Sequence, residues 1–249
     1  MLIDTHSHIH DEDYPLSVDN VLKNAHQNGV EKIICVGTDV DNSRLAIEFA
    51  KSHVKTFASL GVHPHNASMG IEGLQDLIKP ENKVIAIGEV GLDYHYNHSS
   101  PESQKDLLVK QIEIALKYNL PIIFHVREAF DDFWPIFDSF SGIRGVMHSF
   151  TDTSENAQKA IDRGLFIGVN GYATFTKNED QRILFKNLPL DRVLLETDAP
   201  YLTPVPFRGT INESAYVRQV AEYLASLRCE SVEEIAEVTT ANANALFNF

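Results

Sequence analysis

The sequence contains little cysteine. Its 249 residues include two cysteines, Cys35 and Cys229, which lie far apart and show neither a CxxC nor a zinc-ribbon spacing. This argues against a disulfide framework, and two reduced thiols are typical of a cytosolic protein. A chain of this length buries a large core without cross-links, so the scarcity of cysteine is compatible with a stable globular fold.

Basic residues are also scarce. Asp and Glu outnumber Lys and Arg by 35 to 21, which gives a formal net charge of −14. This charge argues against a protein that coats nucleic acid by bulk electrostatics. It leaves room for an enzyme that acts on nucleic acid, because bound metal ions supply local positive charge where the net charge does not.

Long hydrophobic runs are absent as well. No apolar segment approaches the length of a membrane span. The first four residues show neither the basic region nor the apolar run of a signal peptide. We therefore expect a cytoplasmic protein without membrane contact. No linker or low-complexity tract divides the chain and no residue stripe indicates an obligate interface, so we expect one hydrolase domain over residues 1–249 and a monomer.

The chain does show a regular alternation of short β-branched runs with longer segments of helical period. The candidate strands are residues 2–4, 32–37, 55–61, 84–89, 121–126, 145–148, 165–169 and 192–197. Amphipathic segments lie between them, at 18–27, 42–52, 101–118, 156–163 and 212–227, and an extra terminal helix is predicted over 231–249. This order favours an α/β fold, a (β/α)8 TIM barrel with an additional C-terminal helix. An open doubly wound sheet is the alternative, disfavoured because no Gly-x-Gly-x-x-Gly follows the first strand.

Side chains that bind metals stand at the predicted strand ends. The first strand runs into His6 and His8, which face the same way because residues two apart in extended backbone do so. Further candidates end the fourth, fifth, sixth and eighth strands, namely Glu89, His125, His148 and Asp198. Barrel active sites are built at these ends. Any one of them alone would more often be a structural hydrogen-bonding residue, but their joint occurrence favours a metal centre. Four imidazoles and two carboxylates suffice for two divalent ions when one carboxylate bridges.

The chain resembles the TatD family of metal-dependent deoxyribonucleases, within the amidohydrolase-like barrels. Three separate motifs match that family's signatures, namely LIDTHSH at residues 2–8, PIIFHVREA at 121–129 and LLETDAPYL at 194–202. Two more look like family motifs, GVHPH at 61–65 and GEVGLDY at 88–94. The resemblance spans nearly the whole chain. Two positions depart from the family pattern: His10 replaces an Asp or Asn, and residues 208–214 lack one basic residue. The second departure bears on contacts with a phosphate backbone and therefore on substrate preference.

The resemblance implies how the metals are held. His6, His8 and Asp198 would bind one ion, His125 and His148 the second, and Glu89 would bridge them; the residue pattern by itself leaves this assignment open. Two ions about 3.5–4 Å apart orient a water, lower its pKa and stabilise the attacking and leaving oxygens of a phosphodiester. We therefore predict Glu89 and Asp198 as catalytic residues, with Asp198 accepting a proton from the attacking water. Mg, Mn and Zn all suit this ligand set.

Two further residues are predicted to contact the substrate. His63 ends the third strand and is expected to bind the scissile phosphate or the nucleophile; packing within its Pro-turn is the alternative. Arg127 follows His125 by two residues and presents a guanidinium suited to a bidentate phosphate contact, with a salt bridge to Glu89 or Asp93 as the alternative.

Residues behind and around the centre are expected to play supporting roles. Glu196 and Asp93 are carboxylates that we expect to orient ligating histidines. Aromatic residues in the loops after the fourth and seventh predicted strands could stack on unpaired bases, although ordinary loop packing is the commoner role.

The predicted function is that of a metal-dependent hydrolase, a deoxyribonuclease acting as an exonuclease on DNA ends with two divalent ions. A metal-dependent ester or amide hydrolase, such as an aminoacyl-tRNA deacylase, is the alternative. A binding module with purely structural metals is a third reading. It is disfavoured because structural sites close their coordination with protein ligands, whereas sites at a barrel rim leave positions open.

Overall fold

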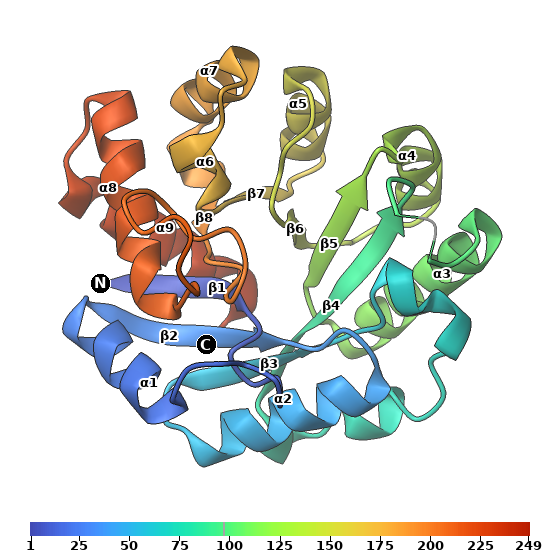
Figure 1. Cartoon of the computed structure of the whole chain (residues 1–249). Coiled ribbons are helices and arrows are strands. Elements are labelled where there is room, and N and C mark those ends of the chain that lie inside the picture. The colour runs from blue at the N-terminus through green and yellow to red at the C-terminus, as the bar shows by residue number, and fades with distance from the viewer. Residues whose placement is uncertain (97) are drawn as a thin grey trace.

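Eight parallel strands form one sheet that curls into a nearly closed barrel (Figure 1). The computed structural model describes residues 1–96 and 98–249. The strands pair in chain order: β1 (Leu2–Ser7), β2 (Val30–Val36), β3 (Thr56–Leu60), β4 (Val84–Asp93), β5 (Ile122–Arg127), β6 (Gly145–Met147), β7 (Phe166–Val169) and β8 (Val193–Leu195). The predicted (β/α)8 barrel is confirmed, and the open sheet is not formed.

Helices lie around the outside of the strands (Figure 1). They are α1 (Val18–Gln27), α2 (Val40–Ser52), α3 (Pro101–Tyr118), α4 (Phe130–Asp138), α5 (Ser154–Asp162), α6 (Tyr172–Phe175), α7 (Glu179–Asn187), α8 (Val217–Arg228) and α9 (Val232–Phe247). Short 3-10 turns are η1 (Pro64–Met69), η2 (Gln75–Leu77), η3 (Pro80–Asn82), η4 (Leu190–Arg192) and η5 (Ser214–Tyr216). Within the residues that the structure describes, no helix has both the length and the apolar character that a membrane crossing requires.

The barrel closes just beyond β8, at the end where the strands finish. Ser7 forms a parallel bridge with Ala199. The backbone N–H of His8 donates to the carbonyl of Ala199 at 2.7 Å, and the N–H of Asp198 donates to the carbonyl of His6 at 2.9 Å. The seam of the barrel thus brings the segment after β1 directly against the segment after β8.

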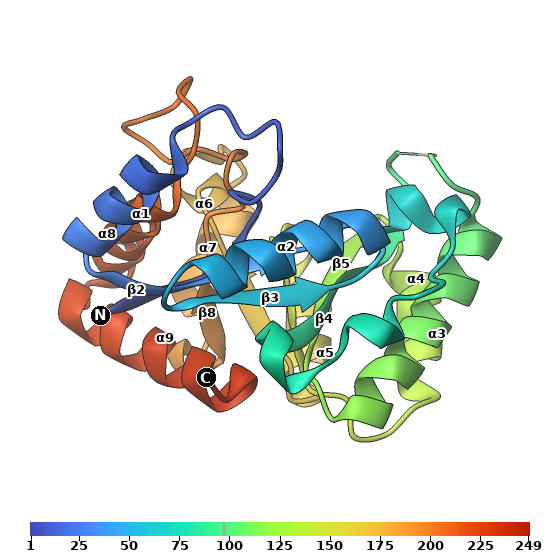
Figure 2. The same ribbon diagram turned by 90° about the horizontal axis from the view of Figure 1, so that it is seen from below.

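The opposite end of the barrel is covered by α9, the predicted extra helix. Thr240 of α9 donates to the carbonyl of Met1 at 3.0 Å, and the Asn242 side chain donates to the carbonyl of Val193 at 2.8 Å, so α9 lies where β1 and β8 begin. Its residues Leu246 and Phe247 are buried in one cluster with apolar side chains of the strands. Figure 2 shows α9 and both chain ends on this side of the barrel. Helix α9 therefore lies at the end of the barrel opposite to the one where the strands finish.

Several element boundaries differ from the sequence prediction. Strand β4 continues to Asp93 instead of ending at Glu89, because residues 90–93 pair in register with β5, as in Asp93 with Arg127. The helix predicted to start at residue 212 starts at Val217, because the Asn212 side chain donates to the carbonyl of Thr197 at 2.8 Å and holds that segment against the barrel.

Candidate metal centre

The six side chains predicted as ligands converge at the carboxyl end of the barrel. Three of them, His6, Glu89 and His125, lie in the strands β1, β4 and β5. The other three, His8, His148 and Asp198, follow the ends of β1, β6 and β8. The carboxyl ends of parallel barrel strands meet on one rim, which explains why positions so distant in sequence come together.

His6, His8 and Asp198 form one group with the dimensions of a cation site. The two Nε2 atoms of the histidines lie 3.1 Å apart. The Oδ1 atom of Asp198 lies 3.7 Å from Nε2 of His6 and 3.5 Å from Nε2 of His8. Two atoms that each bind a tetrahedral ion at about 2.0–2.1 Å lie about 3.4 Å from one another. The donor set and its spacing therefore fit one divalent ion.

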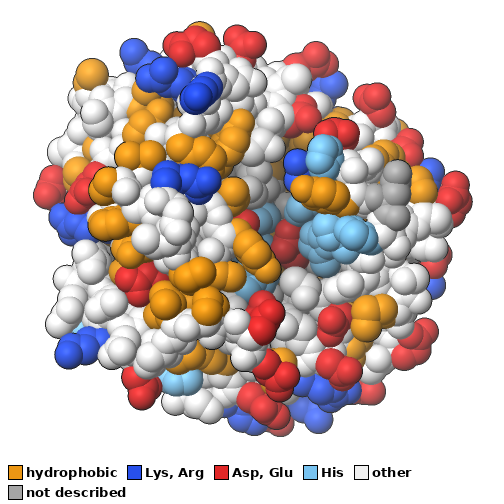
Figure 3. All heavy atoms as spheres, in the orientation of Figure 1, with side chains coloured by type: hydrophobic (Ala, Val, Ile, Leu, Met, Phe, Trp, Pro, Cys, Tyr) orange, Lys and Arg blue, Asp and Glu red, His pale blue; other side chains and the backbone are white. Residues whose placement is uncertain are grey.

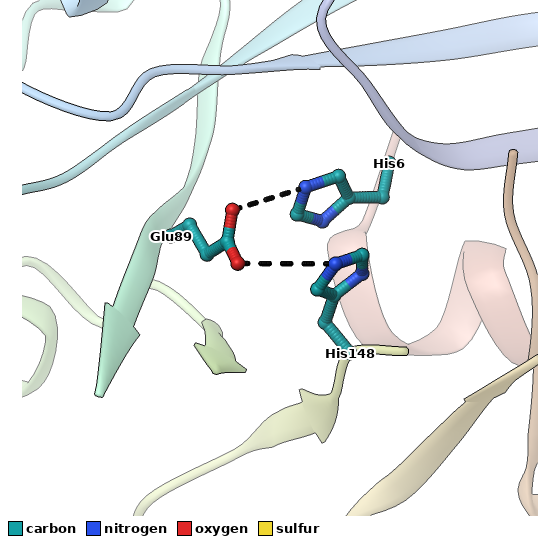
Figure 4. Close-up of side chains that lie close together, drawn as sticks. All are labelled: His6, Glu89 and His148. Atoms are coloured by element: carbon teal, nitrogen blue, oxygen red, sulfur yellow. Dashed lines mark ion pairs between the residues drawn. The ribbon is translucent and has the colours of Figure 1, made fainter. Parts of the chain in front are cut away.

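Glu89 presents its two oxygens to different histidines (Figure 4). Its Oε2 lies 3.3 Å from Nε2 of His6, and its Oε1 lies 3.8 Å from Nε2 of His148. The rings of these histidines stack, with centroids 3.4 Å apart and planes inclined by 16°. A carboxylate that offers one oxygen to each of two neighbouring ligands has the arrangement that bridging requires.

A third group places His63 beside Glu89 and His125. The Oε1 atom of Glu89 lies 2.7 Å from Nδ1 of His125 and 3.6 Å from Nε2 of His63. In the described part of the chain, three trios have ligand atoms within 4.8 Å of one another: His6 with His8 and Asp198, His148 with His6 and Glu89, and His125 with His63 and Glu89. His63, predicted as a substrate contact, thus lies within the centre itself.

Hydrogen bonds behind the rings fix which nitrogen faces the pocket. Nδ1 of His8 lies 2.9 Å from the carbonyl of Val36, so it carries the proton and leaves the Nε2 lone pair free. Nδ1 of His148 lies 3.0 Å from Oε1 of Glu196, an ion-pair contact that leaves Nε2 as the nitrogen facing Glu89. Glu196 is held in place by the N–H of Ser149, which donates to its Oε1 at 2.7 Å. Carboxylate and carbonyl partners of this kind orient histidines for metal binding.

Asp93 plays the corresponding part for His125. Its Oδ2 atom lies 2.9 Å from Nε2 of His125, so the other nitrogen, Nδ1, faces Glu89. Burial lowers the pKa of His125, but hydrogen bonds to Asp93 and Glu89 outweigh it and raise the pKa to about 9. Asp93 also lies 3.1 Å from Nε2 of His65, whose position beside the centre is not predicted from the sequence.

The centre holds buried negative charge that its imidazoles balance. Burial raises the pKa of Glu89, but His63, His148 and His6 outweigh it and hold the pKa well below its ordinary value. Burial lowers the pKa of His148, but Glu196 and Glu89 outweigh it and raise the pKa to about 10. Protons on histidines thus neutralise the carboxylates, and divalent cations meet the same need when they replace those protons.

One residue that positions the centre was not singled out from the sequence. Asp4 is buried in β1, and its carboxylate accepts from the N–H of Thr197 at 2.8 Å and from the Thr197 hydroxyl at 2.7 Å. These bonds align His6 with Asp198 across the barrel seam. The signal for such a role is the carboxylate itself, because a buried charge within an apolar strand needs partners.

Arg127 lies at the rim and is available to a ligand. Its guanidinium carbon stands 5.0 Å from the centre of the Tyr96 ring. The ion pairs among the described residues do not join it to Glu89 or Asp93, whose oxygens face histidines instead. The alternative of a salt bridge behind the ligands is therefore not what the structure shows.

Comparison with known proteins gives concordant matches over almost the full chain. A family model described as TatD related DNase matches residues 3–248. The chain is 39% identical over 252 residues to the uncharacterized metal-dependent hydrolase YabD of Bacillus subtilis, with 99% of each chain covered. It is 35% identical over 244 residues to the 3′-5′ ssDNA/RNA exonuclease TatD of Salmonella typhimurium, with 92% of each covered. The crystal structure of YJJV, a TatD homologue from Escherichia coli K12, matches with a TM-score of 0.92 and 31% identity, covering 100% of this chain and 98% of that one.

Proposed function

Because the chain belongs to the TatD-related DNase family of metal-dependent hydrolases, we propose that it hydrolyses phosphodiester bonds as a deoxyribonuclease, acting as an exonuclease on DNA ends. The family supplies the reaction class, and a relative of the chain is named as an exonuclease of single-stranded DNA and RNA. We further propose that it acts as a monomer in the cytoplasm.

The arrangement of Glu89 carries this proposal. Its carboxylate stands between two groups of side chains, with Oε2 towards His6 and Oε1 towards His125 and His148. In the proposed centre His6, His8 and Asp198 hold one divalent ion, His125 and His148 hold the second, and Glu89 bridges. Two such ions, Mg, Mn or Zn, would polarise the phosphate and promote ionisation of the attacking water.

Asp198 is the proposed acceptor of the proton from the attacking water. Burial raises its pKa, but hydrogen bonding and charge from His8 and His148 outweigh burial and lower it, so the carboxylate is ionised at neutral pH. Its position at the barrel seam sets it at the edge of the pocket, where it can reach a water beside the ions.

His63 is the proposed hydrogen-bond donor to a phosphate oxygen. Its Nδ1 accepts from the N–H of His65 at 3.1 Å, so its proton resides on Nε2. Burial lowers the pKa of His63 to about 3, so the ring is neutral at pH 7 and has no free lone pair at Nε2. The nitrogen that faces Glu89 is thus a donor, which suits a phosphate oxygen and not a metal ion.

Arg127 is the proposed second contact to phosphate. Its planar guanidinium can donate two parallel hydrogen bonds to a phosphate group. Stacking against Tyr96 at 5.0 Å leaves the edge of the guanidinium, which carries the N–H groups, open to the substrate.

The test is a nuclease time course on end-labelled single-stranded and duplex DNA. Metal-stripped protein would be reloaded separately with Mg, Mn and Zn, and Glu89→Gln would control for a contaminating nuclease. We expect laddered degradation by the wild type and none by the variant. DNA left intact with all three metals would contradict the proposal.

A second candidate function is hydrolysis of a carboxylic ester or amide, such as an aminoacyl-tRNA ester. The net charge of −14 favours those esters and amides that are not attached to a polyanion, because so acidic a protein repels long polyanions, tRNA included. A panel of ester, amide and phosphodiester substrates separates the two candidates, and activity confined to phosphodiesters would eliminate this one.

A further inference from the structure

Exposed apolar side chains stand beside the metal centre. They belong to the loop between β8 and α8 and comprise Tyr201, Val205, Phe207 and Ile211, with exposed fractions of 60%, 48%, 36% and 38%. We call these four residues the apolar wall. Figure 3 shows hydrophobic side chains gathered on one side of a hollow and histidines on the other. Exposed apolar residues in a cluster beside a site indicate a contact surface.

The loop that carries the apolar wall is held in one conformation by its own hydrogen bonds. Thr203 donates its hydroxyl to the carbonyl of Thr210 at 2.7 Å, and Arg208 donates to the carbonyl of Thr203 at 2.9 Å. The Phe207 ring stacks on Tyr216 with centroids 4.4 Å apart and planes inclined by 13°. A surface fixed before a ligand arrives loses little conformational entropy on binding, so this wall is suited to recognition.

Tyr201 joins the apolar wall to the candidate metal centre. Tyr201 follows Asp198 by three residues, and its N–H donates to the carbonyl of Asp198 at 2.8 Å. The centroid of its ring lies 6.4 Å from that of His8. A substrate whose reacting group reaches the metal ligands therefore has its neighbouring part against Tyr201.

The two sides of the pocket rim carry charges of opposite sign. The carboxylates of Asp11, Asp198 and Asp13 act on Tyr201, so this flank of the wall is acidic. Arg208, in the same loop, is held over the Phe175 ring, 3.8 Å from its centroid. The cation near the opposite histidines is Arg127, stacked on Tyr96. Phosphates are repelled from the acidic flank and attracted to Arg127. The ligand that fits has a flat apolar part on one side and phosphates on the other.

We propose that the apolar wall stacks the unpaired bases next to the scissile phosphate of a single-stranded nucleic acid, while the phosphates face Arg127. The inference rests on the proposed hydrolysis of nucleic acid and adds how the strand is recognised. Aromatic side chains stack on any base because every base presents a flat face. Paired bases are buried within a duplex, so the wall selects single strands or frayed ends.

The experiment measures binding of metal-loaded protein to two short phosphorothioate single strands of equal length. One carries all its bases, and the other is abasic throughout. The wild type is expected to bind the base-bearing strand at least about 10-fold more tightly than the abasic strand. Tyr201→Ser should abolish most of this preference without changing affinity for the abasic strand. Tyr201→Trp should retain the preference.

Matched variants control for a general loss of apolar surface. Val205→Ser should reduce the preference, whereas Ile183→Ser, on α7 and equally exposed at 48%, should leave it unchanged. Equal affinities of the wild type for both strands would overturn the inference and assign the wall to a protein partner. A preference that survives in Tyr201→Ser would overturn it too.

Cleavage of an ordinary strand, measured in parallel, separates this inference from the proposed function. Cleavage without a base preference in binding would refute only the stacking role of the wall. Base-dependent binding that is lost in Tyr201→Ser, together with intact DNA in every metal, would refute only the hydrolytic function.

Discussion

At the scale of single residues, the candidate centre depends on partners that orient several of its histidines, among them His8, His63 and His125. Sequence alone identified the six candidate ligands, because His and carboxylate residues at the ends of predicted barrel strands have few other reasons to gather there. It could not show that His63 accepts from a backbone amide through Nδ1, at 3.1 Å, since that contact depends on the turn after β3. The role proposed for His63 therefore rests on this contact and not on its residue type.

Replacement of Glu196 by Gln tests the partner of His148. The amide keeps the size of the side chain but removes the charge that lies 3.0 Å from Nδ1 of His148. We expect metal affinity to fall by about 10- to 100-fold, as for other partners of ligating histidines. Titration calorimetry of metal-stripped protein measures the change. The control is Glu222→Gln, at an exposed ion pair on α8. Equal metal affinities of the two variants would argue against a role of Glu196 in orienting His148.

His63→Ala distinguishes a substrate donor from a metal ligand. Loss of one hydrogen-bond donor to a developing negative charge should lower kcat by about 10²- to 10³-fold. Bound metal per chain should stay that of the wild type, because Nε2 of His63 carries a proton. Elemental analysis beside the kinetics gives both quantities, with His26→Ala on the exposed face of α1 as control. A loss of metal in parallel with activity would identify His63 as a ligand instead.

At the scale of secondary-structure elements, the strands were easier to predict than the helices. Near-continuous apolar runs such as residues 84–87 are distinctive because both faces of a barrel strand are buried. Helix α4 was not predicted because Pro135 interrupts its pattern, although its first turns bury Phe130 and Phe133. Helix α7 was missed because its segment, Glu179–Asn187, is mostly polar. The extension of β4 to Asp93 depends on pairing with β5, which no local pattern encodes.

The hydrogen bonds at the seam between β1 and the end of β8 are expected to stabilise the folded protein. Thr197→Val keeps the shape of the side chain but removes the hydroxyl that donates to Asp4 at 2.7 Å. A buried carboxylate oxygen then loses a partner, which should lower the free energy of unfolding by about 1–3 kcal/mol. Urea denaturation of metal-stripped protein measures it. The control Thr151→Val, at an exposed position, should change the free energy of unfolding by less than about 0.5 kcal/mol. Equal changes in the two variants would refute the stabilising role of the Thr197–Asp4 hydrogen bond.

At the scale of the whole molecule, the two ends of the barrel differ. Helix α9 covers the end where the strands begin, and the candidate centre lies at the rim where they finish. The acidic surface, with its net charge of −14, leaves few cations to hold a phosphate backbone. Recognition by metal ions and base stacking is consistent with such a surface, whereas recognition by many phosphate contacts is not.

This charge predicts a weak dependence of single-strand binding on salt. Each neutralised phosphate of a single strand contributes about −0.7 to the slope of log K against log salt concentration. With Arg127 as the cationic side chain proposed to contact phosphate, the slope should be about −0.7. Binding of a phosphorothioate strand to metal-loaded protein over a range of salt gives the value. A slope steeper than about −4 would show that phosphate contacts dominate.

The measurement that tests the central claim most directly is a titration of metal-stripped protein with Mn²⁺, followed by cleavage of an end-labelled single strand. A two-metal centre bridged by Glu89 predicts that activity lags during the first equivalent and saturates at two ions per chain. Full activity at one ion per chain, or no cleavage at saturating metal, would contradict the account.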